Sequence, residues 1–219
     1  MSFELRNLTE VIEEVKKSCK GRGFKQSIEL IVNLRDLDLR RPENRIIGLM
    51  ELPHPPNKPV KVCVFASGEL YTKAKKLGVD LILTRDDLER IAKDKRQAKK
   101  IAKNHDFFVA EASLMPLIGR MWGVYLGPRG KMPTPVPPTA DIESILERLR
   151  RTVRIRVRNQ PVVQLRVGTE DMDSKQIAEN INAALNWIID RLPKGLTNIK
   201  DVYLKGTMTP SFRVEFRRR

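Results

Sequence analysis

The chain has 219 residues and carries 42 lysines and arginines against 27 aspartates and glutamates, a net charge of +15. Apolar residues make up 41%, which is enough to bury a core and excludes wholesale disorder. No apolar run approaches the roughly 20 residues of a membrane helix, no signal-peptide pattern is seen, and two cysteines make no disulfide framework. We expect a soluble cytoplasmic protein whose partner is a polyanion, most simply nucleic acid.

Two stretches concentrate the positive charge. Residues 148–166 hold seven arginines and no acid, and residues 90–103 hold seven bases and one acid, Asp94. A polyanion contact is favoured for residues 148–166 because their charge is so one-sided. For residues 90–103, a solvated helix face and a polyanion contact both stay open.

The first part of the chain mixes a helical pattern with alternating strands. Apolar residues three and four apart predict an amphipathic helix over residues 5–20. Alternation predicts a strand over residues 28–34, and residues 45–52 form a second one. Four prolines between residues 53 and 59 then make a stiff connector, at which we place a domain boundary.

The middle of the chain alternates strands with helices, which predicts a parallel, doubly wound sheet. Five prolines make residues 127–138 a loop rather than a helix or a central strand. Strands are predicted over 60–66, 80–83 and 106–110, and helices over 67–77, 85–103, from about 113 and over 141–151.

The last part returns to the first pattern. Residues 153–157 and 163–167 alternate on either side of a turn at 159–161, which predicts a hairpin. Asp173 and Ser174 are expected to cap a helix that reaches Arg191, and strands around 202–204 and 212–216 close the chain. The economical architecture is a discontinuous α+β domain of residues 1–59 and 152–219, with an α/β domain of residues 60–151 inserted.

The glycines and lysine of residues 127–131 only superficially suggest a phosphate-binding loop. Tyr125 stands where that loop requires its first glycine, and Met132 where it requires a serine or threonine. The prolines also prevent the helix that would follow. We interpret this segment as a rigid basic loop, structural or RNA-contacting, whose residues of interest are Gly127, Arg129, Gly130 and Lys131.

No pattern marks a catalytic or metal site. His54 and His105 have no ligand at metal-binding spacing, and Cys63 lies between valines in a predicted buried strand. We expect neither a metal nor a cofactor.

Residues 205–211, Lys-Gly-Thr-Met-Thr-Pro-Ser, allow two interpretations. They are either only a hairpin turn or a binding site. In a site, the hydroxyls and backbone amides would bond ribose and phosphate, and Met208 would pack on a sugar or base.

Three motifs together resemble the family of large-subunit ribosomal protein one, in its archaeal form. They are residues 24–34, FKQSIELIVNL, residues 126–133, LGPRGKMP, and residues 207–211, TMTPS. The resemblance covers nearly the whole chain. It implies two domains, one inserted in the other, and a stalk protein near the tRNA exit site that binds ribosomal RNA. Many members also repress translation of their own messenger.

The resemblance also implies the binding residues. Thr209 stands where bacterial members have glycine, and Lys131 where they have leucine. We add the arginines and Lys205 for phosphate contact. The expected RNA-binding set is Phe24, Lys25, Ser27, Glu29, Arg154, Arg156, Arg158, Arg166, Gly168, Lys205, Thr207, Met208 and Thr209.

We therefore predict an antiparallel α+β domain of split β-α-β type with two helices, and an inserted three-layer α/β Rossmann-like domain. The protein is expected to be a structural, RNA-binding and regulatory protein, monomeric when free and not bound to membranes. The partners that the resemblance implies are large-subunit ribosomal RNA, its own mRNA and tRNA in the exit site, whose release it is expected to assist. Glu29 would accept a hydrogen bond from a ribose 2′-OH or a base amino group. The alternative is an enzyme whose α/β domain binds a nucleotide or another small ligand.

Overall fold

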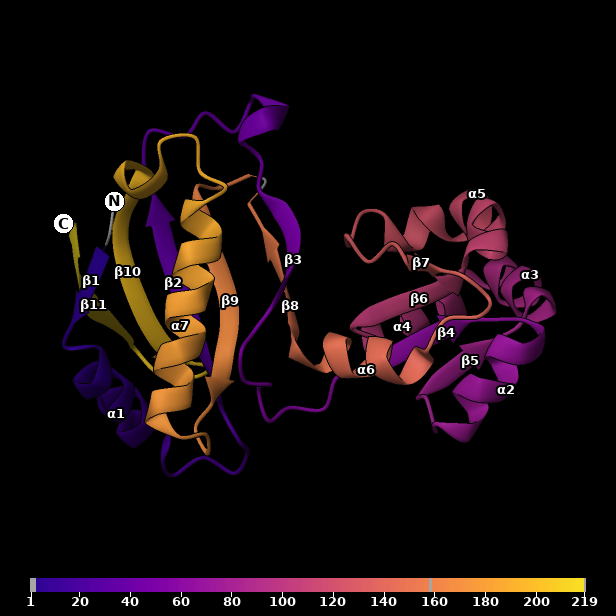
Figure 1. The fold of residues 1–219 in the computed structure, drawn as a ribbon, viewed down its shortest axis with the longest axis horizontal. Helices are drawn as coiled ribbons and strands as arrows, with labels where there is room; N and C mark the ends of the chain where they lie inside the picture. Colours follow the sequence, from indigo (N-terminus) through magenta and orange to yellow (C-terminus); the bar gives the residue numbers. More distant parts are fainter. Residues whose placement is uncertain (1–2, 158, 219) are drawn as a thin grey trace. The chain divides into compact units, whose positions relative to one another are not determined.

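The computed structural model describes residues 3–157 and 159–218. Contacts within the chain group it into two compact units. The first unit combines the residues up to Lys58 with those from Arg151 onward, and the second is Pro59–Arg150. The helices and strands of each are labelled in Figure 1.

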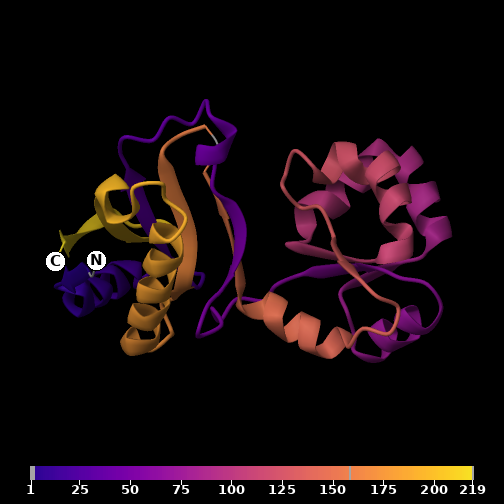
Figure 2. The same ribbon diagram turned by 45° about the horizontal axis from the view of Figure 1, so that its top comes forward.

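The first unit is built on a five-stranded antiparallel sheet with the order β1-β11-β10-β2-β9. Helices α1 and α7 pack on one face of it and share its hydrophobic core (Figures 1 and 2). The elements are β1 Phe3–Arg6, α1 Leu8–Cys19, β2 Ser27–Leu34, β9 Val162–Thr169, α7 Ser174–Ile189, the 3₁₀ turn Gly195–Asn198, β10 Ile199–Gly206 and β11 Ser211–Arg218.

The alternation of β2 divides the two faces of this sheet. Ile28, Leu30 and Val32 are buried under the helices, whereas Glu29 and Asn33 on the opposite face are half-buried. A strand with one apolar and one polar face requires a single register, because a shift by one residue would exchange the faces. The predicted strand over residues 28–34 is confirmed.

A two-stranded ribbon completes the first unit. It pairs β3, Ile47–Glu51, with β8, Thr152–Arg156, and a 3₁₀ turn at Pro42–Asn44 precedes it. The predicted hairpin of residues 153–167 is therefore wrong. Its second half, β9, pairs with β2 instead, and the carbonyl of Pro161 accepts a hydrogen bond from the Leu34 amide. The turn thus carries the chain from one sheet into another.

The second unit holds a four-stranded parallel sheet with the order β5-β4-β6-β7. Helices α3, α4 and α5 contribute to one core cluster and α2 and α6 to another, so the unit has three layers. This mixed α/β structure agrees with the predicted fold class. The elements are β4 Val62–Phe65, α2 Gly68–Lys76, β5 Leu81–Leu83, α3 Arg85–Lys93, α4 Lys95–Asn104, β6 Phe107–Glu111, the 3₁₀ turn Ala112–Leu114, α5 Met115–Leu126, β7 Thr134–Val136 and α6 Ile142–Arg151.

Three other predictions need correction. Residues 127–138 are not all loop, because β7 pairs along the edge of the parallel sheet, with Pro135 opposite Ala110. An edge strand tolerates a proline since its outer side donates to no neighbour. The first helix begins at Leu8 rather than residue 5, because residues 3–6 form β1 and Asn7 has a left-handed φ of 53°. Asp173 also precedes α7 without a side-chain cap.

Candidate nucleic-acid interface

The first and third of the sequence motifs lie side by side in the structure. Strands β2 and β10 pair so that Glu29 is opposite Lys205 and Ile28 opposite Gly206. Beyond the last pair, the amide of Thr207 donates to the carbonyl of Ser27 at 3.1 Å, and the Ser27 amide donates to the Thr207 hydroxyl oxygen at 3.2 Å. Residues 180 positions apart thus form one continuous strip.

The third strand of this strip is β9, on the other side of β2. It places Arg166 opposite Glu29, so that the carboxylate stands between Arg166 and Lys205 in the register of the sheet. All three side chains are half-buried, on the face away from the helices. Opposite charges at directly facing cross-strand positions stabilise a sheet. The two cations offset the negative charge of Glu29 within the strip.

The turn after β10 is held by internal hydrogen bonds. The Thr209 hydroxyl accepts from the Gly206 amide at 2.7 Å, and the Met208 amide donates to the side-chain oxygen of Gln26 at 2.8 Å. Gln26 is fully buried and its amide nitrogen donates to the carbonyl of Cys19. Met208 itself is 58% exposed. The turn therefore presents Met208 to solvent while Thr209 serves the turn's own geometry.

The start of the strip combines an exposed ring with an ion pair. Phe24 is 51% exposed. The Lys25 ammonium lies 2.8 Å from the Asp171 carboxylate, and this hydrogen bond raises the pKa of Lys25. The same bond, followed by one from Thr169, lowers the pKa of Asp171. Sequence reasoning did not single out Gln26 or Asp171, because the partners of both are remote in the chain.

Gly168 has a structural reason to be glycine. A Cβ at this position would lie 3.0 Å from Cγ1 of Ile177 and 3.2 Å from the sulfur of Met172. The missing side chain would therefore point into the core under α7. A role of its backbone toward RNA stays a prediction.

The arginines are distributed over two sheets. Arg154 and Arg156 belong to β8, where they face Leu49 and Ile47 of β3, whereas Arg166 belongs to β9. The ribbon thus presents exposed apolar side chains beside half-buried arginines. Arg158 lies outside the described residues.

The basic loop of the second unit is largely structural. The Lys131 ammonium donates to the carbonyl oxygens of Ala102, at 3.1 Å, and His105, at 2.6 Å, at the C-terminal end of α4. Arg129 donates to the carbonyl of Tyr125. Gly130 has a φ of +64°, a conformation that glycine adopts without strain. Gly127 closes α5 by donating to the carbonyl of Gly123.

The end of β6 carries a carboxylate where α/β proteins often bind ligands. Such sheets bind them beyond the carboxyl ends of their strands. Here Glu111, almost fully buried, accepts hydrogen bonds from the Ser67 hydroxyl at 2.5 Å and the Ser113 hydroxyl at 2.6 Å. These bonds, that of Ser113 first, lower the pKa of Glu111. A fixed negative charge at the start of α2 opposes the binding of a phosphate there.

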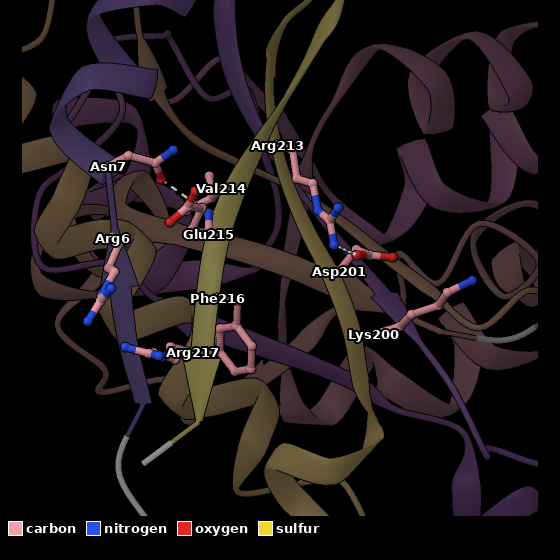
Figure 3. Close-up of a pocket in the computed structure, with 9 residues that line it drawn as sticks. All are labelled: Arg6, Asn7, Lys200, Asp201, Arg213, Val214, Glu215, Phe216 and Arg217. Atoms are coloured by element: carbon pink, nitrogen blue, oxygen red, sulfur yellow. Dashed lines mark hydrogen bonds and ion pairs between the residues drawn. The ribbon is translucent and has the colours of Figure 1, made fainter.

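A groove that sequence reasoning missed lies on β1, β10 and β11 (Figure 3). It has a volume of about 550 Å³, and its lining comes from both ends of the chain. Arg213 pairs with Asp201 at 2.6 Å, and the Glu215 amide donates to the side chain of Asn7 at 3.1 Å. The charged lining residues are Arg6, Lys200, Asp201, Arg213, Glu215 and Arg217.

Two features are absent from the described part of the chain. None of its helices has the length and apolar character needed to cross a membrane. Within the same residues, no three histidine, cysteine, aspartate or glutamate side chains are grouped as metal ligands.

Comparison with known proteins covers almost the entire chain. A model of the ribosomal protein L1p/L10e family matches residues 15–210. The chain belongs to this family. Proteins named large ribosomal subunit protein uL1 are 50% identical over 216 residues in Thermococcus kodakarensis and 51% identical over 216 residues in Pyrococcus horikoshii. These alignments span 98% of the chain, and 100% and 98% of the two relatives.

A third relative with the same name, from Methanothermobacter thermautotrophicus, is 47% identical over 209 residues, which is 95% of the chain and 99% of the relative. The resemblance stated from the three motifs is thereby confirmed, including its archaeal relatives. The chain is a ribosomal protein of the large subunit and not an enzyme.

Proposed function

We propose that the protein binds large-subunit ribosomal RNA through the strip formed by residues 24–29, Arg166 and residues 205–209. The observation that carries the proposal is the pairing of Ser27 with Thr207, which makes one surface of two motifs from opposite ends of the chain. This surface offers exposed hydroxyl, apolar and charged groups within a few residues of one another.

The groups in the strip suit a single-stranded or irregular segment of RNA. Met208 and Phe24 present exposed apolar surface on which a base or ribose packs. Glu29 is an acceptor only, so its partner is a 2′-OH or a base amino group rather than a phosphate. Lys205 and Arg166 beside it offset the repulsion between Glu29 and the backbone. The strip thereby favours RNA over DNA.

In the ribosome, this binding would make the protein part of the mobile stalk near the tRNA exit site. There it would assist the release of deacylated tRNA. The same strip would recognise a similar RNA shape in the protein's own messenger and repress its translation. The support for these finer roles is the family and the fit of the strip to RNA.

We also propose that the two units are domains, the second inserted in the first. Each has its own sheet and its own core. All the residues of the strip belong to the first unit, so RNA recognition should not need the second. Glu111 argues against the alternative of a nucleotide-binding enzyme. Its carboxylate accepts hydrogen bonds from the amide and the hydroxyl of Ser67 at the start of α2, where a phosphate would otherwise bind.

The test measures binding of the full chain to a ribosomal RNA fragment of the stalk. Met208→Ala should weaken it about tenfold, because a base or sugar loses its packing partner. Met132→Ala is the matched control, since Met132 is 43% exposed but lies in the second unit. Thr207→Val also removes the acceptor of the Ser27 amide, so its stability must be measured with its affinity. A folded Met208→Ala variant with full affinity would remove the strip from the interface.

A further inference from the structure

The exposed face of α4 carries five cations and no acid. They are Lys95, Arg96, Lys99, Lys100 and Lys103, all of them exposed. Residues four apart are neighbours on a helix surface, so these side chains form two adjacent rows. The opposite face, with Ala98 and Ala102, is fully buried in the core of the second unit. We call the five cations the α4 patch.

Unlike α4, two other helices of the same unit carry ion pairs on their surfaces. In α2, Glu69 and Lys73 form an ion pair at 2.8 Å, and in α3, Asp87 and Arg90 form one at 2.7 Å. Across residues 3–157 and 159–218, no side chain of the α4 patch makes an ion pair or a hydrogen bond. Like charges four residues apart disfavour a helix. Helix stability therefore does not account for the patch.

Both ends of α4 are fixed, which makes the patch a rigid surface. Asp94 accepts hydrogen bonds from the amides of Arg96, at 2.9 Å, and Gln97, at 3.2 Å, at the first turn. At the last turn, Lys131 donates to the carbonyl oxygens of Ala102 and His105. Cations four residues apart are then spaced by about 6 Å along the axis, at 1.5 Å per residue.

We propose that the α4 patch binds the phosphate backbone of a folded RNA, as a second RNA contact separate from the strip of the first unit. Protein partners fit it less well, because lysine is depleted from protein interfaces, which are anchored by aromatic and apolar side chains. None of the large apolar side chains exposed in the described residues belongs to α4. Phosphate contacts position an RNA without reading its sequence.

The experiment compares two double variants of the full chain. Lys99→Gln with Lys100→Gln removes two charges from the patch, and Lys75→Gln with Lys76→Gln removes two exposed charges from α2 in the same unit. Glutamine preserves helix propensity in both. Affinity for a stalk ribosomal RNA fragment and for tRNA is measured over a range of salt concentrations. For the RNA that meets the patch, the first variant should lose about one to two units of the log–log salt slope and about tenfold in affinity at 0.1 M salt.

Comparing the two RNAs shows which of them supplies the phosphate backbone that binds the α4 patch. A loss for the ribosomal fragment assigns the patch to the stalk RNA, and a loss for tRNA alone assigns it to an RNA that visits the stalk. Equal losses in both double variants would mean that only net charge matters and would overturn the proposal, as would unchanged affinity for both RNAs. The proposal relies on the proposed function only in taking RNA as the partner of the α4 patch. Met208→Ala tests that function independently of α4.

Discussion

The side-chain oxygen of Gln26 accepts a hydrogen bond of 2.8 Å from the amide of Met208, and its nitrogen donates to the carbonyl of Cys19 at the end of α1. One buried amide thus connects helix α1, the start of β2 and the turn that presents Met208. This link makes Gln26 a positioning residue for the proposed strip.

Replacing Gln26 by methionine should weaken ribosomal RNA binding through Met208. The change leaves the Met208 amide and the Cys19 carbonyl unpaired, which costs about 1–3 kcal/mol of stability and loosens the turn. In a Met208→Ala background, the same change should have much less effect on affinity, because the side chain that it positions is gone. Filter binding of the four variants of this cycle is the measurement. Additive losses in affinity would contradict a positioning role.

Lys131 should contribute to the stability of the second unit. Lys131→Met keeps the aliphatic stem but removes the donors to the last carbonyls of α4, and we expect a loss of about 1–2 kcal/mol. Lys99→Met, on the exposed face of the same helix, should change stability by less than about 0.5 kcal/mol. Urea unfolding is followed by the fluorescence of Trp122, a core residue of this unit, in a Trp187→Phe background. Equal urea midpoints for Lys131→Met and Lys99→Met would show that the contacts of Lys131 do not stabilise the second unit.

Regular elements could be predicted from the sequence where their periodicity was long enough. The apolar positions of α7, such as Ile177 and Ile181, are buried as expected, and β2 alternates as expected. Strand β1 has only four residues, which is too short for a period to show. The partner of a strand is not encoded in its own pattern. For that reason β8 and β9 were wrongly joined as a hairpin.

The candidate site shows the same limit. The motifs around Ser27 and Thr207 were recognised separately, but their hydrogen bonds depend on the pairing of β2 with β10. Gln26 and Asp171 gave no signal, because a buried or ion-paired polar residue resembles any other polar residue until its partner is known. Lys131 was interpreted as part of a basic loop, and only the position of α4 reveals its helix-capping contacts.

Excising the second unit should leave the first one folded. Replacing residues 59–150 by a short Gly-Ser linker keeps the five-stranded sheet, the β3–β8 ribbon and the core between the sheet and helices α1 and α7. The product should unfold cooperatively and bind the stalk RNA fragment with its specificity retained. Circular dichroism and filter binding measure both properties. An unfolded product, or one that binds all RNAs alike, would contradict the proposed insertion.

Replacing Glu29 should affect specific and unspecific RNA binding in different ways. Glu29→Gln removes a negative charge that phosphates repel, yet replaces a group that only accepts hydrogen bonds by one that also presents donors to a 2′-OH or amino partner. Specific binding to the stalk RNA should therefore fall by about 1–3 kcal/mol, while binding to an unrelated RNA holds or rises slightly. Asn33→Asp, farther along the same face of β2, serves as a control in which added charge should weaken both RNAs alike. Affinities for both RNAs at several salt concentrations are the measurement. If Glu29→Gln strengthened both equally, Glu29 would be only a repulsive charge on the strand and would have no part in recognising the ribose or the base.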